Sequence, residues 1–255
     1  MHLRDLYAHF MGGSRNHSGH YTALKPHMIL GTVERLQQRI GDRFPDSGLL
    51  RVCGEFHQLA TECTNLARRL EPPFWPVRVA ALGAAVLLLG LVGWAFAQLL
   101  RHFTFDAAGM ADLLQTMEAA INELIFLGLA LYFLLNLETR IKQRTALQAL
   151  HRLRSLAHVV DMHQLTKDPA YVLGTYSDTH SSPQRTLTRQ QLSRYLDYCA
   201  EMLALNAKVA VLFAHSMDDQ VVLNAVNDVE SLTQGMSSKI WQKIMILDLA
   251  ERRAI

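Results

Sequence analysis

The chain has little of what marks a redox, metal or nucleic-acid protein. Its three cysteines among 255 residues form no CxxC pair, and an odd number without a secretory context indicates reduced thiols. The formal net charge is only +2 and no long basic block occurs, so no nucleic-acid partner is expected. The cysteines are Cys53, Cys63 and Cys199.

Motifs for catalysis and segments with the period of a β-strand are also missing. We find no phosphate-binding loop, no GxGxxG, no GxSxG elbow and no kinase motif set, which favours a non-enzymatic role with no cofactor.

Residues 1–27 lack a continuous apolar core, so we expect a flexible arm rich in His and Gly rather than a signal peptide.

Two long apolar runs are present in the middle of the chain, at about 76–100 and 119–137. The first carries Arg78 at its start and no other charge until Arg101, and about 20 apolar residues are enough to cross the hydrocarbon layer of a bilayer. A helix of this length in a water-soluble core would keep a polar face, which the first run lacks. We therefore predict a transmembrane hairpin over 74–137, with the lipid bilayer as a partner.

The charges that flank the two runs predict the orientation of the hairpin. Lysine and arginine gather before the first run and after the second, whereas the connection between them has Arg101 with three acids nearby. Because lysine and arginine near span ends favour the cytoplasm, both termini should be cytoplasmic in a multi-pass protein of a bacterial inner, or plasma, membrane. The flanking cations are Arg68, Arg69, Arg78, Arg140, Lys142, Arg144, Arg152 and Arg154.

The segments outside the hairpin have the spacing of amphipathic helices. Apolar residues recur every three or four positions in 28–73, and a similar stripe from Ile141 to Leu165 continues the second run as a helix. We expect 28–73 and 138–255 to be cytosolic. The predicted fold class is all-α: a two-span transmembrane helical hairpin with a cytosolic α-helical bundle formed by the N- and C-terminal segments.

Boundaries within the C-terminal part come from capping and turn residues. A loop rich in Ser, Thr, Gly and Pro occupies 169–187. Thr188 and Gln191 have the spacing of a capping box at the start of a helix. Ser216, with two acids shortly after it, is expected to start the next helix, and Gly235 is expected to kink or break it.

The most suggestive cluster for chemistry consists of His158, Asp161 and His163. On a helix the first two share a face, and three such groups can ligate a metal or transfer a proton. The zinc motif HExxH places two histidines four residues apart on one side of a helix, and this spacing does not match it. We therefore favour a polar, solvated helix end over a metal or catalytic centre.

Two features inside the apolar runs suggest a role within the membrane. Glu123, beside Asn122, lies about one turn into the second run, and an ionisable group in lipid usually faces a bundle interior or a water path. A position at the outer interface is the alternative. Small residues form a stripe that would let another helix approach closely, within the hairpin or between subunits. They are Gly83, Gly90, Gly93 and Ala97 on the first run and Gly128 on the second.

Cationic side chains in and beside the 169–187 loop are candidates for binding an anion, although we favour a solvated connector. They are His180, Arg185 and Arg189. Farther along the chain, Cys199 lies on an apolar helical stripe and is expected in the core rather than as a nucleophile. Trp241 is also expected in the core, with a membrane-surface or partner-binding helix as the alternative.

Three functions are compatible with this pattern. We favour a non-enzymatic integral membrane protein that forms a homo-oligomer, acting as a small channel or a membrane effector that its cytosolic helices gate or assemble. The second is a membrane-anchored scaffold or signalling protein that binds a cytosolic protein partner through a C-terminal helical hairpin at 188–252. The third is a membrane-bound, metal-dependent enzyme that uses His158, Asp161 and His163.

Overall fold

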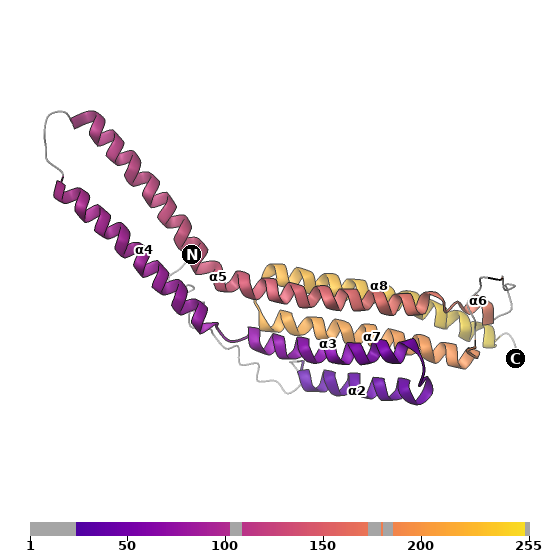
Figure 1. Cartoon of the computed structure of the whole chain (residues 1–255). Helices are drawn as coiled ribbons and strands as arrows, with labels where there is room; N and C mark the ends of the chain where they lie inside the picture. The colour runs from indigo at the N-terminus through magenta and orange to yellow at the C-terminus, as the bar shows by residue number, and fades with distance from the viewer. Residues whose placement is uncertain (1–23, 103–108, 173–179, 181–185, 253–255) are drawn as a thin grey trace. The chain divides into compact units, whose positions relative to one another are not determined.

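Every regular element in the described part of the chain is an α-helix, as the sequence predicts. The computed structural model describes residues 24–102, 109–172, 180 and 186–252 (Figure 1). The expected arm at 1–27 therefore lies almost entirely outside the described residues. The helices are α2 (Pro26–Arg43), α3 (Gly48–Leu70), α4 (Trp75–His102), α5 (Gly109–Leu165), α6 (Pro169–Val172), α7 (Arg189–Ser216) and α8 (Gln220–Arg252).

The chain divides into two compact units. The hairpin unit comprises Pro73–Arg144, and the packed unit comprises Met1–Pro72 together with Thr145–Ile255. Helix α5 is continuous over 57 residues, so its first part belongs to the hairpin unit and its last part to the packed unit. The sequence predicted this continuation of the second apolar run, although α5 starts at Gly109, well before the expected 119.

In the hairpin unit, α4 and the first part of α5 run antiparallel (Figure 1). Helix α3 ends at Leu70 and α4 begins at Trp75, with Pro72 and Pro73 between them. Proline lacks the N–H that an internal helical position donates, which explains why the two helices do not fuse. Among the described residues of this unit only Ala85 is buried, so the large apolar side chains face outward.

In the packed unit, α2 and α3 lie against each other and against α7. The serine before α3 caps that helix, because the Ser47 Oγ accepts the Leu50 N–H at 3.2 Å. Gly48 follows, where a Cβ atom would lie 2.6 Å from Cε1 of His163. Glycine therefore lets α3 start close to the end of α5. The predicted stripe of α2 is buried, namely Ile29, Val33, Leu36 and Ile40.

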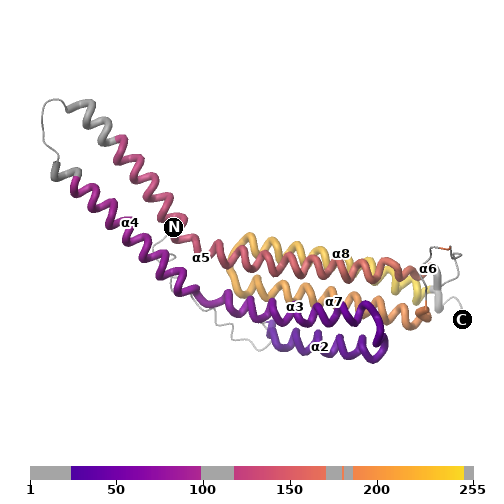
Figure 2. The backbone as a smooth tube through the Cα atoms, in the orientation of Figure 1, coloured from indigo at the N-terminus to yellow at the C-terminus, as the bar shows by residue number. Residues whose placement is uncertain are grey.

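Helices α7 and α8 form an extensive antiparallel contact (Figure 2). The capping box at the start of α7 is confirmed: the Gln191 N–H donates to the Thr188 Oγ1 at 3.3 Å, and the Thr188 N–H donates to the Gln191 Oε1 at 2.9 Å. The expected start of the next helix at Ser216 is wrong, because Ser216 is the last residue of α7. Asp219 instead caps α8, where its Oδ1 accepts the Val221 N–H at 3.0 Å.

Of the kink or break expected at Gly235, the break is wrong. Helix α8 continues through this residue for 33 residues in all. A glycine inside a helix costs about 1 kcal/mol relative to alanine. Thr233 and Met236 on either side are buried in the packed unit, and this burial offsets the cost.

The last part of α5 completes the core of the packed unit. The buried Asn206 of α7 donates from Nδ2 to the Leu153 carbonyl of α5 at 3.0 Å, which satisfies one half of its amide, while its Oδ1 has no hydrogen-bond partner among the described residues. The predicted stripe of α5 is buried in its middle, but its ends are not: Ile141 is 39% exposed and Leu165 is 62% exposed. The largest fully buried side chains include Phe56, Phe213, Leu153, Met202 and Leu203.

All three cysteines are free and buried. Burial raises the pKa of each thiol, those of Cys53, Cys63 and Cys199, to about 12. A thiol with such a pKa is almost entirely protonated at neutral pH and is a poor nucleophile. The interpretation of Cys199 as a core residue is therefore confirmed.

Candidate functional site

A group of charged side chains joins the start of α4 to α5 at the base of the hairpin unit. We call Phe74, Arg78, Glu138 and Lys142 the boundary cluster. Glu138 accepts the Phe74 N–H at 2.9 Å and the Arg78 Nε–H at 2.5 Å. The Lys142 Nζ lies 3.0 Å from Oε1 of the same carboxylate and 4.9 Å from the centre of the Phe74 ring. One carboxylate therefore connects the two helices of the hairpin.

Helix geometry explains this convergence. Side chains tilt toward the N-terminus of their own helix, so Arg78, in the first turn of α4, points back toward the base. Lys142, which is four residues after Glu138, points along α5 toward it. The side chains of Arg78, Glu138 and Lys142 are only 19%, 11% and 12% exposed, so these charged hydrogen bonds are stronger than those of an ordinary surface ion pair.

In the sequence, Arg78 indicates the orientation of the hairpin, but its pairing with Glu138 was not predicted. A signal for the pairing was present. Arg78 is the one cation at the start of the first apolar run, and Glu138 is the acid that follows the second run directly. The two ends of an antiparallel hairpin meet, so these opposite charges were positioned to pair.

Two further arginines follow the boundary cluster on α5, and we call them the boundary arginines. Arg140 places its guanidinium carbon 4.8 Å from the centre of the Phe133 ring. Phe133 in turn contacts Tyr132 edge to face, with ring centres 6.1 Å apart. Arg140 and Arg144 are both exposed, and neither has an acidic partner among the residues that the structure describes.

The helices beyond this base have the length and composition of membrane spans. Trp75–Gln98 and the apolar part of Glu118–Leu165 both satisfy these criteria. In the most apolar stretch of the first helix, 6% of the residues are buried within the chain, and in that of the second helix none is buried. Side chains such as Leu87 and Phe126, each 71% exposed, therefore leave most of their apolar surface uncovered.

The polar residues predicted inside the second span do not form a line across it. Asn122 and Glu123 are both exposed and lie near its far end. Asn136, near the base, donates from Nδ2 to the Tyr132 carbonyl of its own helix at 2.8 Å. A pore or proton-linked role for Glu123 stays a prediction.

Among the residues that the structure describes, the small residues of the spans have no close neighbour on another helix. A Cβ atom added at any of the four span glycines would meet nothing within 4 Å, and Ala97 is exposed. Packing between subunits through this stripe stays a prediction. The glycines are Gly83, Gly90, Gly93 and Gly128.

The structure separates the residues of the predicted histidine and aspartate cluster. His158 is exposed, and Asp161 accepts a hydrogen bond from Gln164 Nε2 at 2.6 Å. His163 packs against Gly48, and burial, with Lys167 and Arg51 nearby, lowers its pKa below the usual 6.5. No group of three His, Cys, Asp or Glu side chains in the described part of the chain could hold a metal ion.

Asp161 instead belongs to a network that links α5 to α8. The Lys243 Nζ donates to the Gln164 Oε1 at 2.6 Å and to the Gln164 carbonyl at 2.9 Å. Burial lowers the pKa of Lys243, and the nearby Asp168 and Asp161 counteract this effect. The network fixes the end of α5 against α8. It was not predicted from the sequence because Lys243 is 79 positions away from Gln164.

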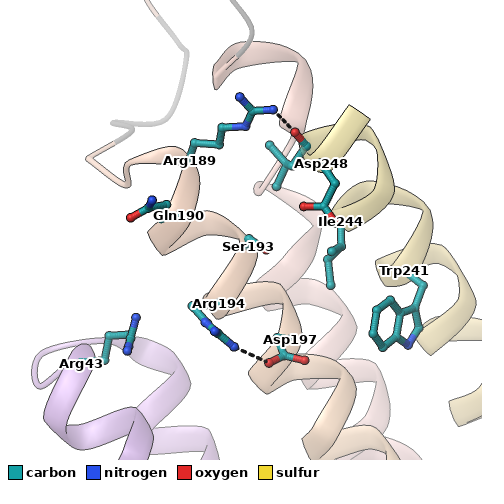
Figure 3. Close-up of a pocket in the computed structure, with 10 residues that line it drawn as sticks. Arg43, Arg189, Gln190, Ser193, Arg194, Asp197, Trp241, Ile244 and Asp248 are labelled. Atoms are coloured by element: carbon teal, nitrogen blue, oxygen red, sulfur yellow. Dashed lines mark hydrogen bonds and ion pairs between the residues drawn. The ribbon is translucent and has the colours of Figure 1, made fainter. Parts of the chain in front are cut away.

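The predicted anion-binding residues do not come together either. Arg185 lies outside the described residues, and His180 is exposed. Arg189 starts α7 and donates a hydrogen bond to the Leu247 carbonyl of α8. It lines an open hollow of about 580 Å³ between α2, α7 and α8, in which Arg194 pairs with Asp197 at 3.6 Å (Figure 3).

Trp241 lies beside this hollow and is 54% exposed (Figure 3). The expectation of a core tryptophan is therefore wrong. Ile240 and Ile244, on either side of it in sequence, take the buried positions of α8. Because one residue turns a helix by about 100°, the side chain next to Ile240 points away from the core.

Comparison with protein-family models, with curated proteins and with solved structures finds no match to this chain. Function is therefore inferred from the residues themselves. The boundary cluster and the boundary arginines are the strongest candidates. The cluster combines burial with charge, and the arginines add exposed charge and a contact between Arg140 and an aromatic ring at the edge of the apolar segments.

Proposed function

We propose that this chain is a non-enzymatic integral membrane protein whose hairpin unit anchors the packed unit to one face of a bilayer. The observation that carries the proposal is the outward exposure of most of the large apolar side chains that the structure describes in the hairpin unit. Burying one such side chain is worth about 1.5–3 kcal/mol. Many of them in water would cost more than a typical domain is stable by, whereas a bilayer removes the cost.

The proposed orientation places the base of the hairpin in the cytoplasm. The base carries Arg78, Arg140, Lys142 and Arg144 against the single acid Glu138. Such an excess of arginine and lysine close to span ends favours the cytoplasmic side. The packed unit, which is joined to the same end of the hairpin, would be cytoplasmic together with both termini.

Membrane extraction and cysteine labelling test the anchor and its orientation. The chain is expected to resist alkaline carbonate extraction from membranes. Because the native thiols are buried with a pKa of about 12, the unmodified protein gives little background. A membrane-impermeant maleimide should label Thr104→Cys on intact spheroplasts and Ser155→Cys only after lysis. Extraction by carbonate, or the reverse labelling, would reject the proposal.

Within this proposal, an anchor that serves a scaffold is favoured over a channel. The first span has no polar face, and the described polar residues of the second lie only near its ends. A water path lined by such helices would lack polar groups. An anchored scaffold binds other proteins without conduction, so purified protein in liposomes should cause no ion leak.

A homo-oligomeric effector or channel is the second candidate. It is supported by the open space around the four span glycines, which leaves room for another helix to approach. Chemical crosslinking and sizing in detergent decide between the candidates. A strict monomer removes the channel, whereas a discrete oligomer with ion flux in liposomes removes the scaffold. We propose no metal centre, because His158, Asp161 and His163 are not brought together.

A further inference from the structure

The boundary arginines carry charge that the hairpin unit does not neutralise. The segment from Glu138 to Arg144 contains one acid against three cations. That acid, Glu138, already binds Arg78 and Lys142. Arg140 and Arg144 have no acidic partner among the described residues. An external anion is therefore the natural partner of this pair.

The spacing of the two arginines suits one anion shared between them. They are four residues apart on α5 and so lie on the same helix face, one turn apart. Two like charges in this arrangement repel each other when nothing lies between them. Guanidinium groups bind phosphate oxygens through paired hydrogen bonds, so a phosphate between them would remove the repulsion.

The position of Arg140 relative to the aromatic rings indicates where this phosphate would come from. Its side chain reaches back along α5, about two turns, to the ring of Phe133 at 4.8 Å. Phe133 and Tyr132 are 48% and 57% exposed and belong to the apolar segment. A cation beside the last apolar side chains of a span lies at the depth of lipid headgroups.

We propose that Arg140 and Arg144 together bind the headgroup phosphate of an anionic phospholipid, with its acyl chains beside Tyr132 and Phe133. This inference rests on the proposed membrane insertion. A soluble phosphate would leave the two exposed rings without an apolar partner. A zwitterionic lipid brings its own ammonium group, which the arginines repel. Each arginine near an anionic membrane surface strengthens attraction about fivefold, so the pair together contributes about 25-fold.

Lipid titration of the full chain in detergent tests the proposal. Bound lipids are counted by native mass spectrometry, with phosphatidylglycerol and phosphatidylcholine of identical acyl chains as probes. The unmodified chain should bind phosphatidylglycerol at least tenfold more tightly than phosphatidylcholine. Arg140→Gln with Arg144→Gln should remove most of this preference, while binding of phosphatidylcholine stays unchanged. Arg140→Lys with Arg144→Lys keeps both charges and should retain the preference.

A matched control removes two exposed arginines from the packed unit, through Arg51→Gln with Arg154→Gln. This variant should bind both lipids as the unmodified chain does. Equal binding of the two lipids by the unmodified chain would overturn the proposal. So would an equal loss in the control, or full displacement of phosphatidylglycerol by millimolar inorganic phosphate.

Carbonate extraction of the same samples separates this inference from the proposed function. Resistant protein without a preference for phosphatidylglycerol rejects the lipid site alone. Protein that carbonate extracts rejects membrane anchoring, and the lipid site is rejected with it.

Discussion

The two units of this chain use the same secondary structure but turn their apolar side chains in opposite directions. In the packed unit, apolar residues at helical spacing turn inward, and side chains such as Phe56 and Phe213 are fully buried. In the hairpin unit, side chains of the same kind turn outward, and Ala85 alone among the described residues is buried. Apolar residues recur at helical spacing in the packed unit, where water is the solvent. This spacing is lost in the hairpin unit, where the proposed solvent is lipid.

Polar groups show the same contrast. The packed unit spreads its polar contacts over separate places, including the Asn206 amide in the core and the Lys243 network at the end of α5. The hairpin unit gathers them at its base, where Glu138 binds three donors. Charged groups that would be costly in hydrocarbon therefore lie together at the end of the apolar segment.

The largest effect should come from a cavity in the packed unit. Phe213→Ala removes a fully buried ring, and such substitutions cost about 3–5 kcal/mol. Thermal unfolding of the chain in detergent, followed by circular dichroism, should shift down by about 10 °C. Phe126→Ala, at a ring that is 71% exposed in the hairpin unit, is the control and should shift the transition little. Equal shifts would contradict the division into an inward-packed and an outward-facing unit.

Replacing one exposed leucine in each unit by lysine should show whether that unit is surrounded by lipid or by water. Leu129, in the middle of the second span, is 52% exposed, and Leu165, in the packed unit, is 62% exposed. In water both substitutions by lysine would be nearly neutral. Within a bilayer Leu129→Lys should cost roughly 3 kcal/mol of insertion free energy, whereas Leu165→Lys should cost almost nothing.

The measurement for this pair is the fraction of each variant that resists carbonate extraction. The resistant fraction should fall for Leu129→Lys and stay at the level of the unmodified chain for Leu165→Lys. Two equally resistant variants would mean that the hairpin unit does not lie in lipid.

Much of this fold could be predicted from local pattern. The apolar runs, the stripe of α2 and the capping box of Thr188 and Gln191 each depend on residues close together in the sequence. Failures came where a local signal competed with packing. Gly235 resembles a helix breaker, yet the burial of its neighbours Thr233 and Met236 keeps α8 intact.

The candidate site was harder to predict because its partners lie far apart in the sequence. Arg78 and Glu138 are 60 positions apart in the sequence, and most of both apolar runs lies between them, so their ion pair exists only after the hairpin forms. The cluster of His158, Asp161 and His163 shows the opposite error. Its residues are close in sequence, but different positions around α5 direct them to solvent, to the Lys243 network and to Gly48.

A moderate effect is expected from removing the charge of the boundary cluster. Glu138→Gln leaves Arg78 and Lys142, both mostly buried, without their carboxylate. The loss of hydrogen bonds to a charged group costs about 1.5–3 kcal/mol. The midpoint of unfolding by sodium dodecyl sulfate should fall for the chain in mixed micelles.

Glu123→Gln is the matched control, since it makes the same chemical change in the same unit. Glu123 is exposed near the far end of the span, and its substitution should leave the midpoint almost unchanged. If both variants unfold alike, the contacts of Glu138 contribute nothing specific to the hairpin.

The smallest effect concerns the pH dependence of the packed unit. Burial, with help from Lys167 and Arg51, lowers the pKa of His163 below 6.5, so the unfolded chain binds a proton more readily than the folded chain does. Stability from the neutral imidazole is complete above pH 6.5 and is lost as the pH falls through the lower, folded pKa. As the pH is lowered from about 7.5 to 5, the free energy of unfolding should therefore fall less for His163→Gln than for the unmodified chain.

Gly48→Ala offers an independent way to change the same histidine. Its Cβ atom would lie 2.6 Å from Cε1 of His163, so the imidazole must turn toward solvent, where its pKa returns toward 6.5. The pH dependence should then resemble that of His163→Gln. Gly54→Ala, where the added Cβ atom meets Gln37 Nε2 at an ordinary 3.5 Å, should behave as the unmodified chain. A chain in which Gly48→Ala leaves the pH dependence unchanged would show that burial against α3 does not control His163.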